Sequence, residues 1–293
     1  MSRPVFFLLD VFAGEKYAGN PLAVVRRGEG LTAEAMQKIA REFNFSETTF
    51  ILSDRRRRGG YDVRIFTPAR ELPFAGHPTL GTAFVIQQEL IRQPVRKVVL
   101  NLKVGPIPVS FHYRGRGPDI LWMQQAEPEF GATIEPRRLA AVLGLRPKDV
   151  DPRFPLQEVS TGIPFMIVPV KTLEAVRKSR FCEDKSAALA GLGKAFLLFT
   201  PEVELPGSDL HVRVFAHDYG VAEDPATGSA NGCLAGYLVR YRCFGGFGVD
   251  IRVEQGLEVG RPSRLFLRAE EKAGRIEVSV GGRVIPVARG QLL

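Results

Sequence analysis

The stretch ELPFAGHPTLGTA, residues 71–83, decides how the chain is organised, because a related stretch, EDPATGSANGCLA, occupies residues 223–235. The two align without a gap, and the distance between them is close to half of the 293-residue chain. Their shared residues are Glu71 and Glu223, Pro73 and Pro225, Gly76 and Gly228, and Ala83 and Ala235. We therefore predict that the chain is one design built twice.

Each stretch begins a helix that has almost no polar face. Residues 76–89 start with GHPTLGTAFVI and residues 228–240 start with GSANGCLAGYLV, so both are small or apolar nearly all round. A helix of this kind has to be buried on every side. Pro78 suits the first turn, where its missing N–H would have had no partner within the helix. The pattern predicts a sheet rolled around one buried helix in each half.

Short strand-like runs, bounded by Gly, Pro or charged turns, supply that sheet. In the first half they are residues 5–11, 22–25, 48–52, 61–66, 95–102, 107–113 and 120–124. In the second half they are residues 165–170, 195–199, 210–215, 249–254, 263–268, 276–280 and 284–287. Residues 32–43 predict a conventional amphipathic helix, which Thr32 caps. The fold class is therefore α+β.

The segment AEPEFGATI, residues 126–134, is the best candidate for a domain boundary. It predicts an N-terminal domain of residues 1–126 and a C-terminal domain of residues 127–293. The last strand, residues 283–293, is able to pair with either half, so its return to the first domain stays open.

A buried helix still has N–H groups at its start that lack partners within the helix. If the two helix starts face each other across the domain boundary, these groups and both helix dipoles converge on one cleft. Such a cleft binds anions and suits a carboxylate. Gly76 and Gly228 would let the ligand approach the backbone closely.

The charge of the chain raises the question of a nucleic-acid partner. The net charge is +8, but the 40 Lys and Arg residues are spread along the chain. The one dense run, Arg55–Arg58, lies between two predicted strands and is typical of a solvated hairpin tip. We therefore expect no nucleic acid as a partner and retain such binding only as a distant alternative, one in which affinity would fall steeply with salt.

The cysteines and the apolar segments indicate a cytoplasmic protein. The cysteines, Cys182, Cys233 and Cys243, show neither CxxC nor zinc spacing, which fits a reducing compartment. The start, MSRPVFFLLD, is too short in apolar residues for a signal peptide, and no segment predicts a membrane span.

Together the motifs carry a family resemblance. The stretches DVFAGEKYAGNPLAVV, FNFSETTFIL, IFTPARELPFAGHPTLGTA, STGIPFMIVPV and DPATGSANG follow one another between residues 10 and 232. In this order they resemble the PhzF-like family of phenazine-biosynthesis isomerases, whose fold is similar to that of diaminopimelate epimerase. The resemblance implies two similar halves, each a β-barrel wrapped around a central helix, with the active site in the cleft between them. It also implies a homodimer.

The chemistry that the resemblance implies is proton transfer on carbon without a metal or organic cofactor. The named member of the family isomerises a dihydro-hydroxyanthranilate, so the expected partner is a small anionic substrate with a carboxylate. Carried over by motif, Glu47 of SETTF is the general acid/base. The remaining catalytic residues are then His77, Asp224 and Ser229. The expected substrate-binding residues are Ser46, Gly76, Thr227, Gly228 and Asn20, the last chiefly by shaping a turn.

The departure from the epimerase is also informative. Diaminopimelate epimerase places a cysteine at the start of each central helix, and the corresponding positions here are Ala75 and Thr227. Cys233 lies deeper in its helix and is typical of a small core residue. We therefore do not expect a two-thiol epimerase. An epimerase or racemase with non-thiol bases, and a catalytically silent binding protein, remain as alternatives.

Other reaction classes find less support. A hydrolytic triad would need Ser229 in a GxSxG elbow, but it lies in GSANG. Walker, GxGxxG and HExxH motifs for nucleotides or zinc do not occur. The remaining histidines, His112, His211 and His217, show no partner pattern, so we predict structural roles for them.

Overall fold

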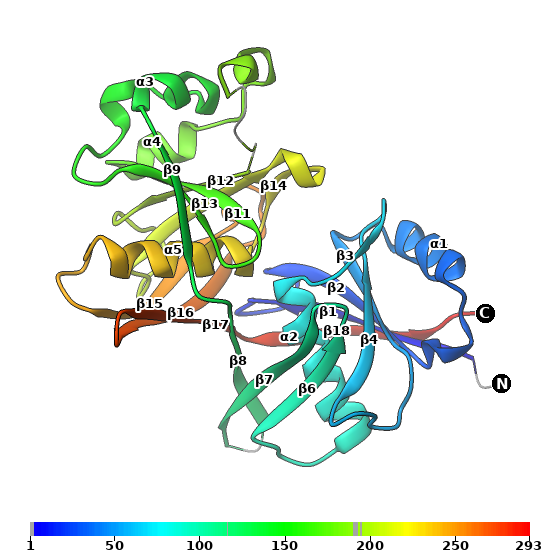
Figure 1. Ribbon diagram of the computed structural model, residues 1–293. Coiled ribbons are helices and arrows are strands. Elements are labelled where there is room, and N and C mark those ends of the chain that lie inside the picture. The colour runs from blue at the N-terminus through cyan, green and yellow to red at the C-terminus, as the bar shows by residue number, and fades with distance from the viewer. Residues whose placement is uncertain (1–2, 116, 190–192, 194) are drawn as a thin grey trace. The chain divides into compact units, whose positions relative to one another are not determined.

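The computed structural model describes residues 3–115, 117–189, 193 and 195–293. The chain forms two compact units, shown in Figure 1. Unit 1 comprises Met1–Gln124 and Gly281–Leu293, and unit 2 comprises Gln125–Val280.

Unit 1 is a curved sheet around the helix α2 (Gly76–Val85). Its strands follow the order β18-β1-β2-β3-β4-β6-β7-β8, in which β2–β3 and β4–β6 are parallel and the other pairs with recorded register are antiparallel. The bounds are β1 Val5–Val11, β2 Asn20–Arg26, β3 Glu47–Ile51, β4 Tyr61–Phe66, β5 Glu71–Leu72, β6 Lys97–Leu102, β7 Gly105–Arg114, β8 Gly117–Gln124 and β18 Val284–Gln291. The short β5 pairs with β4.

Unit 2 repeats this plan around the helix α5 (Gly228–Arg240). Its strands follow the order β9-β10-β11-β12-β13-β15-β16, with β11–β12 and β13–β15 parallel. The bounds are β9 Glu129–Ile134, β10 Leu156–Ser160, β11 Pro164–Pro169, β12 Ala195–Thr200, β13 Leu210–Ala216, β14 Val221–Asp224, β15 Gly248–Gln255, β16 Ser263–Lys272 and β17 Arg275–Gly282. The short β14 pairs with β13, as β5 does with β4.

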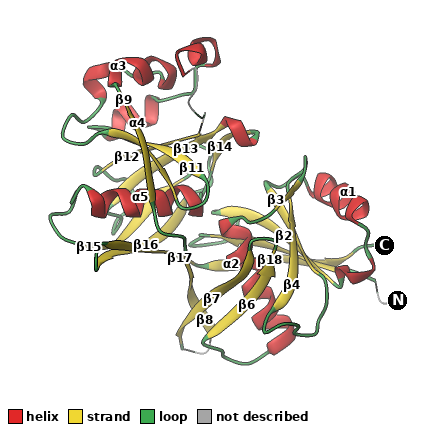
Figure 2. Ribbon diagram, viewed as in Figure 1, coloured by secondary structure: helices red, strands yellow, loops and turns green. Residues whose placement is uncertain are grey.

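The two units therefore share one topology, and the prediction of two similar halves is confirmed. The ladder β1-β2-β3-β4-β6-β7 has the same sequence of parallel and antiparallel pairs as β10-β11-β12-β13-β15-β16. Figure 2 shows strands dominating each unit, with α2 and α5 in the equivalent places. The fold class is α+β, and each sheet contacts its central helix through many of its strands.

An arginine–glutamate pair recurs at the equivalent place in each unit. Arg64 of β4 donates to both carboxylate oxygens of Glu71 in β5, at 2.8 Å each. Arg213 of β13 donates to both oxygens of Glu223 in β14, at 2.9 and 2.7 Å. Paired, fork-like contacts of this kind fix geometry more strongly than a single ion pair. The shared Glu71 and Glu223 thus hold each short strand just before its central helix.

The central helices are buried as the sequence predicts. Every residue of α2 is buried, and in α5 only Ser229 and Arg240 are not. In α2 the helix gives way after Val85 to a wider π-helical turn, Ile86–Ile91, so the predicted helix over residues 76–89 ends earlier as a regular α-helix. The predicted span of α5, residues 228–240, is confirmed.

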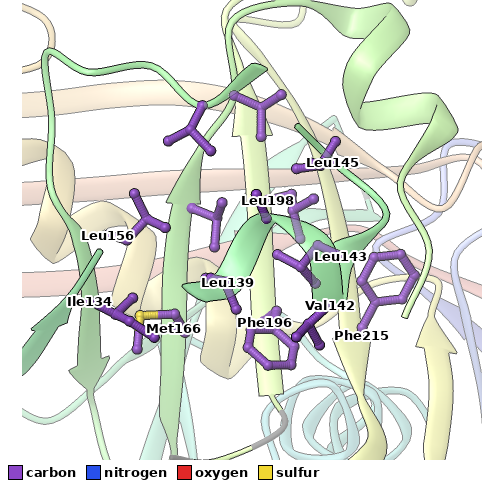
Figure 3. Close-up of a cluster of buried hydrophobic side chains, with 14 of the residues drawn as sticks. Ile134, Leu139, Val142, Leu143, Leu145, Leu156, Met166, Phe196, Leu198 and Phe215 are labelled. Carbon is purple, nitrogen blue, oxygen red and sulfur yellow. The ribbon is translucent and has the colours of Figure 1, made fainter. Parts of the chain in front are cut away.

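Outer helices complete the core of each unit. In unit 1, Thr32 caps α1 (Ala33–Phe43) as predicted, because its side chain accepts a hydrogen bond from Ala35 N. In unit 2, α3 (Pro136–Leu139) and α4 (Leu173–Lys178) accompany several 3₁₀ turns. A cluster of apolar side chains from the sheet and from residues 134–189 packs there, as Figure 3 shows. The sequence patterns did not predict these short helices, or the strand β9 in the segment taken as a boundary. Within the described residues, the 3₁₀ turns are Gly28–Gly30, Ala140–Leu143, Pro147–Asp149, Glu183–Leu189 and His217–Tyr219.

None of the helices in the described parts of the chain combines the length and apolar character that crossing a bilayer requires.

Gly236 allows α5 to pass close to the preceding chain. A Cβ placed at Gly236 would meet the Pro128 ring at 2.5 Å, a separation that real Cβ atoms do not tolerate. We predict that Gly236→Ala lowers the free energy of unfolding by about 1–3 kcal/mol, because overpacking outweighs the gain in helix propensity.

Urea unfolding measures this difference. Gly14→Ala is the control, because a Cβ at Gly14 meets nothing within 4 Å. Equal stabilities of the two variants would contradict the close approach of α5 and Pro128.

Candidate active site

The pleat of β3 directs Glu47 toward the central helix. Thr49 Oγ1 and Thr82 Oγ1 of α2 are hydrogen-bonded at 2.7 Å, so the Thr49 side of β3 faces this helix. Side chains two residues apart in a strand share a face. Glu47 therefore faces the start of α2. The strand covers about 6.6 Å from Glu47 to Thr49 and the helix about 7.5 Å from His77 to Thr82, so the two distances match.

Glu47 and His77 consequently lie in contact. His77 Nε2 is 3.3 Å from Glu47 Oε2, slightly longer than an ideal hydrogen bond, and the side chains are 7% and 16% exposed. Burial lowers the pKa of His77 to about 3, although a hydrogen bond with the backbone of Pro21 opposes the shift. At neutral pH the imidazole is therefore uncharged.

The partner at Pro21 also fixes which ring nitrogen carries the proton. The main chain of proline has a carbonyl oxygen but no N–H, so the imidazole has to donate in this bond. Nε2 takes part in no hydrogen bond within the described residues, which leaves Nδ1 as the donor. A neutral imidazole has one N–H, and Nε2 is then an acceptor that faces the Glu47 carboxyl group.

The other predicted residues of unit 1 lie around this pair. Asn20, fully buried, begins β2, and Leu22 of that strand pairs in parallel with Glu47. Ser46 directly precedes Glu47 and is half-buried. Gly76 is the first residue of α2, and the residue before it, Ala75, provides no side-chain cap. The first turn of α2 therefore presents backbone N–H groups that no side chain at the cap position satisfies.

The predicted residues of unit 2 form a second group at the start of α5. Asp224 is buried at the end of β14, and Thr227 is the residue that precedes the helix. Thr227 Oγ1 donates to Asp224 Oδ2 at 2.5 Å. Gly228 and Ser229 occupy the first turn of α5, with Gly228 buried and Ser229 half-buried.

Both donors of Thr227 already have partners within unit 2. Its backbone N–H donates to Gln255 Oε1 at 3.2 Å, and its hydroxyl donates to Asp224. The hydroxyl therefore does not cap α5, whose first turn has no side-chain cap. The backbone N–H groups of Gly228 and Ser229 are the ones that this arrangement leaves for a ligand.

Known proteins match the chain over nearly its whole length. A family model described as "Phenazine biosynthesis-like protein" matches residues 9–290. The trans-2,3-dihydro-3-hydroxyanthranilate isomerase of Pseudomonas aeruginosa is 36% identical over 98% of this chain and 99% of that protein. An uncharacterized isomerase of Mesorhizobium japonicum is 36% identical over 98% of each protein. A solved phenazine biosynthesis protein of the PhzF family from Bacillus anthracis shares 27% identity, with a TM-score of 0.88 over 100% of both chains.

The chain belongs to the PhzC-PhzF family. The predicted resemblance is thereby confirmed, and so is the assignment to the isomerases, since several curated relatives carry that name. The similarity to the Bacillus anthracis structure agrees with the fold described above. The roles of Glu47, His77, Asp224 and Ser229 stay predictions at this point.

Other residues of this PhzF-like isomerase are placed largely as expected. Cys233 is fully buried in α5, and burial raises its thiol pKa to about 11. The Arg55–Arg58 run forms the tip of the β3–β4 hairpin, where Arg57 pairs with Glu29 and Arg58 pairs with Asp62. In the described part of the chain, no group of three or more His, Cys, Asp or Glu side chains is arranged to hold a metal ion.

Gln255 and His211 are buried polar residues whose contacts the sequence did not reveal. Gln255, at the end of β15, binds the Asp224–Thr227 segment, although it is distant in sequence. His211 Nδ1 lies 2.8 Å from Glu254 Oε1, and its Nε2 lies 2.9 Å from Glu258 Oε1. The sequence around a single glutamine or histidine in a strand contains no pattern that predicts such partners.

The two carboxylates make His211 the opposite of His77. Burial by itself lowers the pKa of His211, but the hydrogen bonds to Glu254 and Glu258 outweigh it, so the pKa is raised. Burial by itself raises the pKa of Glu258, but the hydrogen bond from His211, the charge of His211 and the charge of Arg213 together outweigh it, so the pKa is lowered. The pKa of the same residue type is thus lowered in unit 1 and raised in unit 2.

The raised pKa of His211 predicts a pH-dependent stability. Because the folded pKa of His211 is raised, its contribution is fully present below about pH 6.5, the unfolded value, and is lost as the pH rises through the folded pKa. We predict that His211→Gln costs about 3–5 kcal/mol at pH 6, because it leaves buried carboxylates without their partner, and that this cost shrinks at alkaline pH.

Urea unfolding between about pH 6 and pH 9 measures this cost. The exposed His112 provides the matched control, His112→Gln. A cost for His211→Gln that is the same at both ends of this range would contradict a raised pKa of His211.

Proposed function

We propose that this isomerase moves a proton between carbon atoms of a small cyclic carboxylate, with Glu47 as its single general acid/base. The Pseudomonas aeruginosa relative is named for trans-2,3-dihydro-3-hydroxyanthranilate, and that compound is the proposed substrate. The observation that carries the proposal is the contact between Glu47 and a buried, neutral His77.

In the proposed reaction, the Glu47 carboxylate removes a proton from one ring carbon, and the electron pair of that C–H bond moves into the adjacent π system. The carboxyl group then returns the proton to another carbon, so that the substrate is rearranged and the enzyme is restored. No group other than Glu47 has to change its net protonation. One carboxyl can perform both transfers because it alternates between base and acid.

His77 would support both states of Glu47. A cation beside a carboxylate weakens it as a base, and a neutral imidazole avoids this effect. When Glu47 is protonated, its O–H can donate to Nε2, whose lone pair faces it. The 3.3 Å separation is of the kind that shortens when substrate binds.

The helix starts would bind the substrate's carboxylate. The first turns of α2 and α5 each lack a side-chain cap, so the N–H groups of Gly76, His77, Gly228 and Ser229 are suited to an anion. Asp224 would bind the amine or hydroxyl group. Ser229, half-buried in its first turn, would add a hydroxyl donor. The proposal requires no metal or organic cofactor. It keeps the expectation of a homodimer, which rests on the resemblance, and that of a cytoplasmic protein, which rests on the cysteines and apolar segments of the sequence.

The proposal predicts that Glu47→Gln lowers kcat by about 10²–10⁴-fold, because an amide cannot accept the proton. The measurement is proton NMR of trans-2,3-dihydro-3-hydroxyanthranilate incubated with enzyme in deuterated buffer. Wild type should isomerise the compound and incorporate deuterium at the carbon that receives the proton.

Glu34→Gln, on the exposed face of α1, is the matched control and should behave like wild type. Turnover that survives in Glu47→Gln would refute the assigned base. Deuterium uptake without rearrangement would instead indicate an epimerase or racemase. Binding without either change would indicate a binding protein.

A further inference from the structure

Gln255 is a fully buried amide whose hydrogen-bonding capacity is completely used. Its Oε1 accepts from Thr227 N at 3.2 Å and from Asn231 Nδ2 at 2.9 Å. Its Nε2 donates to Asp224 O at 2.7 Å and to Thr227 Oγ1 at 3.1 Å. An amide side chain has two donor and two acceptor positions, and all are filled by residues at the start of α5.

The partners fix the direction of this amide. Thr227 N can only donate, so it has to face the amide oxygen. Asp224 O can only accept, so it has to face the amide nitrogen. A flipped amide would place its oxygen against Asp224 O and its nitrogen against Thr227 N. Burial makes such unmatched contacts costly.

The amide in turn sets the direction of the Thr227 hydroxyl. Because Gln255 Nε2 donates to Thr227 Oγ1, the hydroxyl proton points elsewhere, and the Asp224 carboxylate accepts it at 2.5 Å. A short bond from a hydroxyl to a charged oxygen is stronger than one between neutral groups. The chain of donors thus runs from Gln255 through Thr227 to Asp224.

The strand that carries Gln255 is itself held firmly. Gln255 pairs with Val212 of β13 and with Ser263 of β16. The next residue, Gly256, has φ +80°, and a Cβ there would meet Pro225 O at 2.5 Å. The end of β15 therefore packs directly against the backbone of the turn that contains Asp224.

We infer that Gln255 is a positioning residue, which holds Asp224 and directs the Thr227 hydroxyl toward its carboxylate. The inference rests on the proposed function only in so far as Asp224 serves the reaction. Its structural part, the control of the Asp224 carboxylate, stands independently of any substrate.

Two substitutions test the inference. Gln255→Glu keeps the shape and the acceptor but replaces the donor with an oxygen, which would accept the Thr227 proton instead. Gln255→Met removes the hydrogen bonds without adding a charge. In Gln255→Glu the new carboxylate competes for the Thr227 proton, and in Gln255→Met nothing holds the Thr227 hydroxyl toward Asp224, so the bond from Thr227 weakens and Asp224 should protonate at higher pH in both variants. The readout is ¹³C NMR of the Asp224 carboxyl carbon across a pH titration, and it needs no substrate.

Gln157→Glu provides the matched control. Gln157 is a buried amide of β10 that donates to Gly131 O and accepts from Tyr241, away from the Asp224 group. It should leave the Asp224 titration unchanged. Thermal unfolding followed by circular dichroism identifies which variants are folded. If both Gln255 variants are unfolded, Thr227→Val tests the same chain of donors without altering Gln255.

In the enzyme assay, Gln255→Glu should lower kcat/KM by about tenfold or more and move the acidic limb of its pH profile upward. Combining it with Thr227→Val should lower kcat/KM little further, since both substitutions break the same chain of donors from Gln255 through Thr227 to Asp224. An Asp224 titration at the wild-type pH in a folded Gln255 or Thr227 variant would overturn the inference. Failure of wild type to turn over the substrate would overturn the proposed function alone, because the NMR titration is still decisive for Gln255.

Discussion

The burial of α2 and of all but two residues of α5 is the constraint on which the rest of the structure depends. A helix without a polar face needs apolar partners on every side, and here a curved sheet supplies them in each unit. Close packing then requires small residues at the contacts, as at Gly236 against Pro128. The same burial leaves each helix start as the place where backbone N–H groups remain unsatisfied by the helix, which is a ready site for an anion.

Burial also shifts the pKa of the titratable groups, and the neighbours of each group determine the direction of the net shift. Burial lowers the pKa of His77, and its hydrogen bond to the Pro21 backbone does not outweigh this effect, so the ring is neutral beside Glu47. His211 is buried as well, yet its hydrogen bonds to two carboxylates outweigh this effect and raise its pKa. The proposed reaction needs a carboxyl group that both takes and returns a proton. A neutral neighbour is compatible with that task, whereas a permanent cation would favour the carboxylate alone.

The sequence predicted those features that local pattern or repetition encodes. The repeated motif revealed the duplicated topology, and the apolar character of residues 228–240 predicted α5 with its observed bounds. The motif resemblance selected Glu47 and His77, which the pleat of β3 brings together. The sequence did not predict the pairs Arg64–Glu71 and Arg213–Glu223, because only the glutamates belong to the recurring stretch. The sequence did not predict the role of Gln255 either, because its hydrogen bonds join residues far apart in the chain, which no sequence spacing indicates.

The most direct test of the account is ¹⁵N NMR of the histidine rings over about pH 5 to 8, the range in which an ordinary histidine titrates. We predict that His77 shows a neutral ring with one protonated nitrogen, Nδ1, throughout this range. His211 serves as the charged reference in the same spectrum, with both nitrogens protonated at the acidic end. Titration of His77 with a midpoint near the ordinary value of about 6.5 would contradict the claim that burial keeps a neutral imidazole beside Glu47.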